Sequence, residues 1–284
     1  MSRATHGVVS IAALDVRGRP DHRSELTSQL LLGEVVRLTG SRLEGQWWRV
    51  ENLADGYRGW VRGWGLVPAT FTRARNWQSR ARGRVAVPMV EALARKGRSA
   101  LVSPLFLGSR VIPGAARGGW RRVELPDGRR GWVPAAKLTL RGEKPALLER
   151  VMSLLGAPYH WGGRTPLGLD CSAFVQLVLG EQGVCLPRDA AHQVRVSRRL
   201  QPGEEPLPGD LVFFAAPGAP PGHIGIGLGG GYFAHCRGMV RIGSVESSNP
   251  LCDKALMSQL VGWRRPVEIP PGDPRRRGGR GDSA

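Results

Sequence analysis

The chain has 284 residues, of which 41% are hydrophobic, and a formal net charge of +18. This length exceeds the usual domain size of about 100 to 150 residues, so we expect two or three domains, and no run approaches the roughly 18 apolar residues of a membrane helix. The charge favours polyanions such as nucleic acid, but the arginines are spread through every segment without a recognised binding motif, so we expect no specific nucleic-acid function.

The N-terminus and the cysteines indicate a compartment. Residues 1–11 contain no apolar signal core followed by a small-residue cleavage site, so classical export is not expected. The cysteines all fall in the C-terminal half, without the close paired spacing of a zinc site, at Cys171, Cys185, Cys236 and Cys252. We therefore expect a cytoplasmic protein with no metal and no cofactor. Secretion, or association with the cell wall, by a route without a visible signal peptide is the alternative.

An internal repeat occupies the first half of the chain. Each copy has an apolar run that ends in glycine, then a strand that begins with tryptophan, then a Gly-Trp-Val strand. These marks lie at 30–33, 48–50 and 59–61, and again at 105–108, 120–123 and 131–133. Asp-Gly turn signals break the short β-favouring runs, which is typical of small barrels built from hairpins. The repeat predicts two small β-barrels, at residues 5–70 and 75–140.

The pattern of apolar residues changes near Pro145, from short β-favouring runs to the spacing of a helix. Residues 146–156 have the apolar spacing of a helix that ends in glycine. We expect this helix to open a third domain at residues 145–266. Prolines, glycines and the block Arg275-Arg276-Arg277 then predict a disordered basic tail at residues 267–284.

Cys171 is the candidate nucleophile. It follows Asp170 and precedes Ser172, where a glycine-containing loop leads into an apolar helical run. Asp170 is a good N-cap residue, and the free N–H groups and positive dipole end of a helix lower the pKa of a thiol. We therefore expect Cys171 to be a thiolate in the first turn of a helix.

Two histidines on neighbouring predicted strands are candidates for the base. His223 lies in the run Gly-His-Ile-Gly-Ile, and His235 lies in Tyr-Phe-Ala-His-Cys, with three glycines between the two runs. Alternation of apolar residues predicts an antiparallel hairpin. A cysteine and two histidines carry little weight alone, because most free cysteines are inert and most lone histidines are structural.

The order of the motifs resembles the NlpC-type cell-wall cysteine peptidases over about residues 145–265. The motifs are Tyr-x-Trp-Gly-Gly, Asp-Cys-Ser, Gly-Asp-Leu-Val-Phe-Phe, Gly-His-Ile-Gly-Ile and a histidine on the next strand. The repeated barrels resemble the bacterial SH3 domains that accompany such enzymes. The resemblance implies an α+β fold, with a papain-like peptidase domain preceded by two small SH3-like β-barrels.

The same resemblance implies roles for four residues. Cys171 would be the nucleophile, His223 the general base and His235 the residue that orients the base. The hydroxyl of Tyr159 would help the Cys171 backbone N–H to stabilise the oxyanion. The thiolate would attack an amide, His223 would protonate the leaving amine, and water would release the thioester without a metal.

Family members with two SH3 domains resemble enzymes that cut between γ-D-glutamate and a diamino acid, in peptides whose L-alanine has a free amine. Such enzymes recycle murein peptides. The resemblance implies that Glu34 and Tyr57 bind the free amine, that Asp170 and Ser172 line the free end of the substrate, and that Arg188 faces a carboxylate. For Glu34 and Tyr57, a solvated acid and a packed aromatic ring are equally compatible with the sequence.

Three other functions stay open at this point. They are a noncatalytic wall-binding protein, an acyltransferase on the same scaffold, and an exported hydrolase of intact cell wall. The intact Cys171, His223 and His235 argue against the first. We expect peptidoglycan-derived peptides as partners. The sequence does not select diaminopimelate, lysine or ornithine as the diamino acid, and it fixes no oligomeric state.

Overall fold

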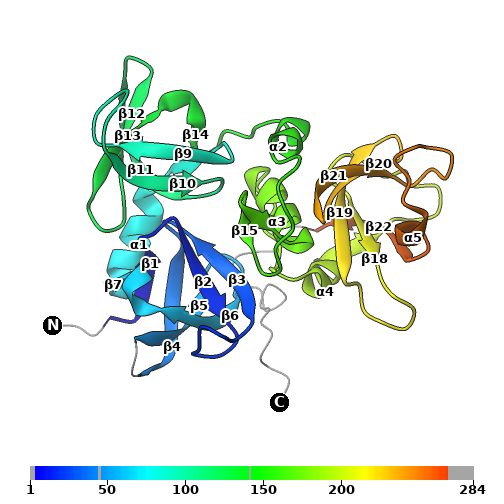
Figure 1. Ribbon diagram of the computed structural model, residues 1–284, viewed down its shortest axis with the longest axis horizontal. Helices are drawn as coiled ribbons and strands as arrows, with labels where there is room; N and C mark the ends of the chain where they lie inside the picture. Colours follow the sequence, from blue (N-terminus) through cyan, green and yellow to red (C-terminus); the bar gives the residue numbers. More distant parts are fainter. Residues whose placement is uncertain (1–3, 44–45, 141, 268–284) are drawn as a thin grey trace. The chain divides into compact units, whose positions relative to one another are not determined.

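The computed structural model describes residues 4–43, 46–140 and 142–267 (Figure 1). The chain forms two compact units, with the boundary between Pro145 and Ala146. None of the helices in these three ranges is long and apolar enough to cross a membrane. The predicted disordered tail lies outside the described residues except for Val267.

The first unit begins with a seven-stranded antiparallel sheet. Its elements are β1 (His6–Val9), β2 (Ala13–Arg17), β3 (Leu26–Leu31), β4 (Val35–Leu43), β5 (Trp47–Asn52), β6 (Arg58–Arg62), the 3₁₀ helix η1 (Gly63–Gly65) and β7 (Leu66–Ala69). The strands pair in the order β3-β2-β6-β5-β4-β1-β7. Val9, Leu14, Val36, Val50 and Val61 belong to one buried cluster. Strands from across the sheet therefore share a single core, as in a small barrel.

A second seven-stranded sheet repeats this topology. Its elements are β8 (Gly83–Val85), β9 (Met89–Leu93), β10 (Leu101–Phe106), β11 (Arg110–Arg117), β12 (Trp120–Glu124), β13 (Arg130–Pro134), η2 (Ala135–Lys137) and β14 (Leu138–Leu140). The order β10-β9-β13-β12-β11-β8-β14 matches the first sheet strand for strand. The sequence repeat is therefore also a repeat of topology.

Helix α1 (Phe71–Arg80) connects the two barrels and packs against both. Thr70 caps its N-terminus, and the indole N–H of Trp77 donates to the carbonyl of Gly33 at 2.9 Å. The backbone N–H of Arg110 donates to Leu32 at 2.8 Å. Gly33 has a φ of 86°, and a Cβ there would lie 2.2 Å from the Arg110 carbonyl oxygen. A glycine is thus required where the two barrels touch.

The second unit consists of a six-stranded sheet with short helices. Its elements are α2 (Leu147–Ser153), β15 (Arg164–Thr165), β16 (Gly168–Leu169), α3 (Cys171–Glu181), α4 (Ala190–Gln193), η3 (Val194–Val196), β17 (Ser197–Arg199), β18 (Leu211–Phe214), β19 (His223–Gly229), β20 (Tyr232–Arg237), β21 (Met239–Ser244), α5 (Lys254–Met257) and β22 (Leu260–Pro266). The strand order is β17-β22-β18-β19-β20-β21. The predicted helix at 146–156 is present as the shorter α2.

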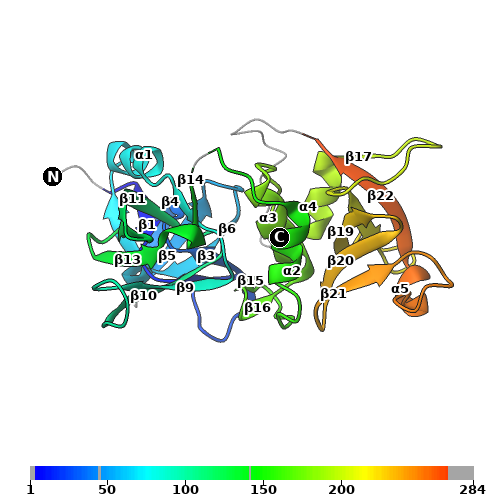
Figure 2. The same cartoon turned by 90° about the horizontal axis from the view of Figure 1, so that it is seen from above.

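Helix α3 is the central helix of this unit. All its residues except Gly180 are buried, as expected for a helix that is apolar on every side. It packs against β19 and β20, and Figure 2 shows α3 and α4 on one side of the sheet with α5 on the other. This packing brings the first turn of α3 to the start of β19.

Candidate active site

The first turn of α3 holds the candidate nucleophile. Asp170 is the N-cap, and its carboxylate accepts a hydrogen bond from the Ala173 backbone N–H at 2.8 Å. Cys171 follows as the first helical residue and is only 6% exposed. Its Sγ lies 3.9 Å from the carbonyl oxygen of Gly222, the residue before β19. The thiol therefore faces the strand that begins with His223.

The protonation state of Cys171 differs from the sequence-based expectation. Burial, with a smaller contribution from the Asp170 carboxylate, raises the pKa of the thiol to about 12. The backbone N–H of Ile224, the charge of Arg188 and the backbone N–H of Ser172 oppose this shift without reversing it. The expectation of a thiolate at rest is therefore wrong, because burial destabilises the thiolate more than the helix N-terminus stabilises it. The neutral thiol is the resting form.

His223 and His235 form a hydrogen-bonded pair. Nε2 of His223 lies 2.9 Å from Nδ1 of His235, with the two rings close to perpendicular at 77°. Burial lowers the pKa of His223 to about 4, and burial together with the charge of His223 lowers that of His235 to about 3. Both rings are neutral at ordinary pH. Since Nε2 of His223 is engaged, its Nδ1 is the ring nitrogen that can accept a proton.

Asp170, Ser172 and Arg188 form a buried network. The Arg188 guanidinium binds both carboxylate oxygens of Asp170, at 2.9 and 2.6 Å, and donates to the Ser172 hydroxyl at 3.0 Å. The side chain of Arg188 is 0% exposed. Although burial alone would raise the pKa of Asp170, the Arg188 charge holds it below its usual range. This bidentate pair fixes the residue that caps α3.

Three residues predicted to contact the substrate have partners inside the protein. The buried charge of Arg188, predicted to face a substrate carboxylate, is paired with Asp170. Asp170 and Ser172, predicted to line the substrate, are each 5% exposed, and their side chains bind each other and Arg188. All three residues are therefore buried and contact one another next to the candidate nucleophile.

Tyr159 is anchored beside the segment that enters α3. Its backbone N–H donates to Gly238 at 2.8 Å, and it forms a parallel bridge with Leu169, two residues before Cys171. The side chain is half-buried. The structure thus brings Tyr159 to the same region as Cys171.

Glu34 and Tyr57 belong to the first unit. Tyr57 is 3% exposed in the barrel core, where its hydroxyl donates to the Thr27 carbonyl at 3.2 Å. The carboxylate of Glu34 accepts from the Leu31 backbone N–H at 3.0 Å. For Tyr57 these contacts match the alternative of a packed aromatic ring, while its binding of a free amine stays a prediction. Glu34 likewise has a local structural contact.

Sequence reasoning missed three charged residues beside the histidines. Arg237 and Arg241 both lower the pKa of His223 and of His235, after the larger effect of burial. Both arginines bind the carboxylate of Asp253, at 2.5 and 3.4 Å. Arg237 stands two positions after His235, so the two-residue period of a strand was a usable signal.

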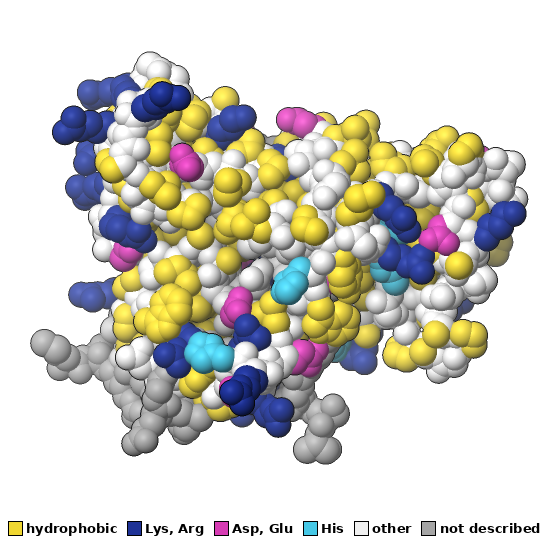
Figure 3. Space-filling view, in the orientation of Figure 1, with side chains coloured by type: hydrophobic (Ala, Val, Ile, Leu, Met, Phe, Trp, Pro, Cys, Tyr) yellow, Lys and Arg dark blue, Asp and Glu magenta, His cyan; other side chains and the backbone are white. Residues whose placement is uncertain are grey.

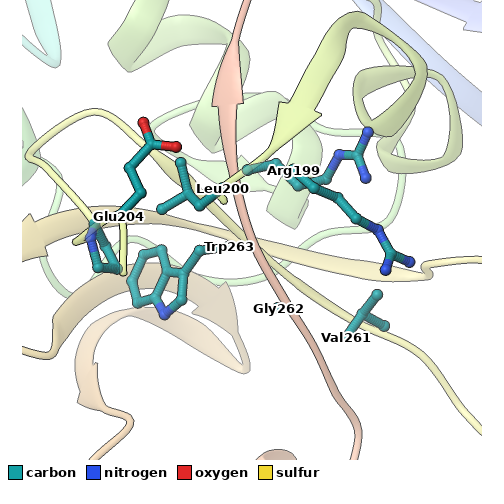
Figure 4. Close-up of a pocket in the computed structure, with 8 residues that line it drawn as sticks. Arg199, Leu200, Glu204, Val261, Gly262 and Trp263 are labelled. Atoms are coloured by element: carbon teal, nitrogen blue, oxygen red, sulfur yellow. The ribbon is translucent and has the colours of Figure 1, made fainter. Parts of the chain in front are cut away.

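A pocket of about 280 Å³ lies elsewhere in the second unit (Figure 4). Leu200 lies between Arg199 and Glu204 in this view (Figure 4), and Trp263 of β22 forms part of the wall. Its lining includes neither Cys171 nor either histidine of the pair. This pocket is therefore separate from the candidate nucleophile.

Two family models match the chain. The NlpC/P60 family model matches residues 156–260, and the bacterial dipeptidyl-peptidase SH3 domain model matches residues 16–65. The first match contains Cys171, His223 and His235, and the second contains Glu34 and Tyr57. The second barrel has the topology of the first but lies outside both matches.

Known proteins resemble the chain over different lengths. Dipeptidyl-peptidase 6 of Lysinibacillus sphaericus is 26% identical over 90% of this chain and 97% of that protein. The γ-D-glutamyl-L-lysine dipeptidyl-peptidase of Bacillus subtilis is 35% identical over 34% of this chain and 32% of that protein. A probable endopeptidase of Mycobacterium tuberculosis is 31% identical over 39% and 29%, respectively. The chain matches about a third of the length of the last two relatives.

Solved structures show the same fold. A crystal structure of an NlpC/P60 family protein from Bacillus cereus matches with a TM-score of 0.78 at 20% identity, over 93% of this chain and 100% of that one. An NlpC/P60 endopeptidase from Photobacterium damselae matches with a TM-score of 0.69 at 15% identity, over 93% and 71%. The predicted α+β class, a papain-like domain after SH3-like barrels, is confirmed. The chain is therefore an NlpC/P60 family protein whose peptidase domain follows N-terminal bacterial SH3 domains.

Proposed function

We propose that the chain is a cysteine peptidase that hydrolyses the bond between γ-D-glutamate and the following diamino acid in peptidoglycan-derived peptides. The observation that carries the proposal is the 2.9 Å contact of His223 with His235, at the strand that faces the buried Cys171. The nearly full-length similarity to a dipeptidyl-peptidase, and the local similarity to a γ-D-glutamyl-L-lysine dipeptidyl-peptidase, support this bond as the target.

The protonation states suggest how the first step proceeds. Cys171 begins as a thiol, so its proton must move to Nδ1 of His223 as Sγ attacks the substrate carbonyl. The imidazolium that forms keeps its Nε2–H, which donates to Nδ1 of His235. The backbone N–H of Cys171, in the first turn of α3, is our candidate donor to the oxyanion.

The remaining steps regenerate the thiol. His223 returns the proton to the leaving amine, the C–N bond breaks, and a thioester remains on Cys171. Water then attacks the thioester with His223 as base, and the released thiolate recovers the proton. In this scheme His235 orients His223 and stabilises its charged form, as the third residue of a triad does.

We further propose that the preferred substrates are free-amine peptides, which would make the protein a recycling enzyme. The similarity to proteins named as dipeptidyl-peptidases supports the idea, since a dipeptide product requires cleavage near a free end. An exported hydrolase of intact wall, an acyltransferase and a wall-binding protein remain the alternatives that the test must distinguish.

The test is product analysis by mass spectrometry. L-Ala-γ-D-Glu-L-Lys and its diaminopimelate analogue, each free or N-acetylated, are incubated with wild type, Cys171→Ala and Cys185→Ala. Cys185 is an exposed cysteine, so its variant controls for the loss of a thiol and should retain activity. We expect L-Ala-D-Glu from free-amine peptides with wild type and Cys185→Ala alone.

Other outcomes would identify the alternatives. Equal cutting of acetylated peptides would contradict the free-amine requirement and favour intact wall as substrate. An amide formed with an added amine, in place of the acid product, would indicate acyl transfer. Binding without cleavage in the wild type would indicate a wall-binding protein.

A further inference from the structure

Four side chains of the second unit project from one face of its sheet. His235 pairs with Arg241 across β20 and β21, so these two side chains are direct neighbours on the same face. Arg237 is two residues after His235, and His235 also pairs with Gly225, two residues after His223. Because side chains alternate along a strand, the four residues share the face. The arginines thus lie beside the proposed catalytic pair.

Asp253 balances only part of this charge. One of its oxygens accepts from the Leu256 backbone N–H at 3.0 Å and caps α5, while the other contacts both guanidinium groups. Two cations therefore share one carboxylate. The side chains of Arg237 and Arg241 are 46% and 39% exposed. In the contacts described, each guanidinium uses one terminal nitrogen, and other N–H donors remain for a ligand.

A purely structural role does not account for this position well. Exposed ion pairs contribute little to stability, about 0 to 1 kcal/mol. Two cations that share a single carboxylate, moreover, oppose the positive charge that His223 must carry during catalysis. Figure 3 shows basic side chains gathered beside a histidine and an acidic side chain over β20 and β21, open to solvent. An anion bound to the two arginines would offset this repulsion next to His223.

We propose that Arg237 and Arg241 form a subsite that binds a carboxylate of the peptide substrate next to the scissile bond. This inference rests on the proposed peptidase function and extends it to substrate selection. Arginine suits the task because its planar fork matches a carboxylate. Two carboxylates of the proposed substrate qualify: the α-carboxylate of γ-D-glutamate and the carboxylate of the diamino acid.

Binding to an inactive enzyme tests the subsite without turnover. Titration calorimetry is run on Cys171→Ala, and on the same protein with Arg237→Gln or Arg241→Gln added. The peptides are L-Ala-γ-D-Glu-L-Lys, its analogue with D-isoglutamine, and its analogue ending in lysinamide. Arg198→Gln is the matched control, since Arg198 lies on β17 at the far edge of the sheet, where it is exposed and pairs with Glu204.

We expect each subsite variant to weaken binding of the acid peptide by about tenfold, as loss of one charge-assisted contact predicts. One of the two amidated peptides should bind the parent equally weakly and show no further loss in the variants. Which peptide does so identifies the carboxylate. The Arg198→Gln control should bind all three peptides like the parent.

Three results would overturn the subsite. They are undiminished binding of the acid peptide to both variants, equal losses for all three peptides, and no binding of the acid peptide to the parent. Cleavage assays on the active enzyme then separate the two proposals. If wild type cuts the peptides but the variants bind normally, the subsite fails and the peptidase function stands.

Discussion

The protonation state of the histidine pair determines the expected pH dependence of activity. His223 must be neutral to accept the thiol proton, and its pKa is lowered to about 4. We therefore predict that kcat/KM is level from neutral pH down to about pH 5.5 and falls tenfold per unit below about pH 4. A histidine with its ordinary pKa near 6.5 would lose activity at much higher pH.

Two controls accompany this profile. Circular dichroism at each pH separates unfolding from protonation. Arg241→Gln removes a charge that lowers the pKa of His223, so the decline should move to higher pH in that variant. An acid limb near pH 6.5 in the wild type would mean that the buried, neutral pair is not the catalytic form.

Arg188 shows how a buried charge can resemble a binding residue in sequence. We predict that Arg188→Met lowers the free energy of unfolding by about 3 to 5 kcal/mol, because it leaves the Asp170 carboxylate buried and unpaired. Arg198→Met, at an exposed and solvent-screened pair, should leave the free energy of unfolding almost unchanged. Urea denaturation measures both. If Arg188→Met instead raised KM at unchanged stability, the original prediction of a substrate contact would be restored.

The individual residues of the site were only partly predictable. The motifs identify Cys171, His223 and His235 because a helix start and two neighbouring strands are local patterns. The pairing of Arg188 with Asp170 joins segments 18 residues apart, and nothing local distinguishes a guanidinium that binds a carboxylate inside from one that binds it outside. The thiolate expectation failed similarly, since burial of Cys171 depends on packing against β19 and β20.

At the scale of elements, the repeat predicted both barrels but not the helix between them. Only Ala74 and Trp77 are buried among the residues of α1, and Phe71 is exposed. Two buried apolar residues give too weak a hydrophobic periodicity to indicate a helix from the sequence. The helix exists because Thr70 caps it and because Trp77 reaches Gly33 in the first barrel.

The contact between the two barrels yields a prediction with a matched control. Gly33→Ala combines an unfavourable φ of 86° with a Cβ 2.2 Å from the Arg110 carbonyl, while Gly128→Ala has a φ of 84° and nothing within 4 Å. Gly128→Ala should lower the free energy of unfolding by about 1 to 2 kcal/mol, the cost of a positive φ for a residue with a Cβ. Gly33→Ala should lower the free energy of unfolding clearly more, because the barrels must also move apart.

Urea denaturation followed by tryptophan fluorescence measures this difference, since most tryptophans lie in the first unit. Equal losses in the two variants would show that the tight contact at Gly33 relaxes without cost. A larger loss in Gly33→Ala would show that the close contact between the two barrels stabilises the first unit.

At the scale of the whole molecule, the net charge of +18 should act on an anionic substrate before it reaches the site. Such a field raises association rates and is screened by salt. We predict that kcat/KM for L-Ala-γ-D-Glu-diaminopimelate, whose three carboxylates outnumber its two ammonium groups, falls several-fold between about 20 mM and 200 mM KCl, as the screening length shortens. The same peptide with its carboxylates amidated carries only positive charges, so its kcat/KM should not fall with salt.

The double variant Arg237→Gln/Arg241→Gln separates the local contribution from the global one. If the whole field matters, this variant still loses activity with salt, though less steeply than the wild type. If only the two arginines matter, its salt dependence disappears. Equal salt dependence for acid and amidated peptides in the wild type would contradict both, and would mean that the scattered arginines leave no useful field at the site. The charge of the chain would then reflect composition, whereas recognition would depend on the few cations that share a sheet face with His223 and His235.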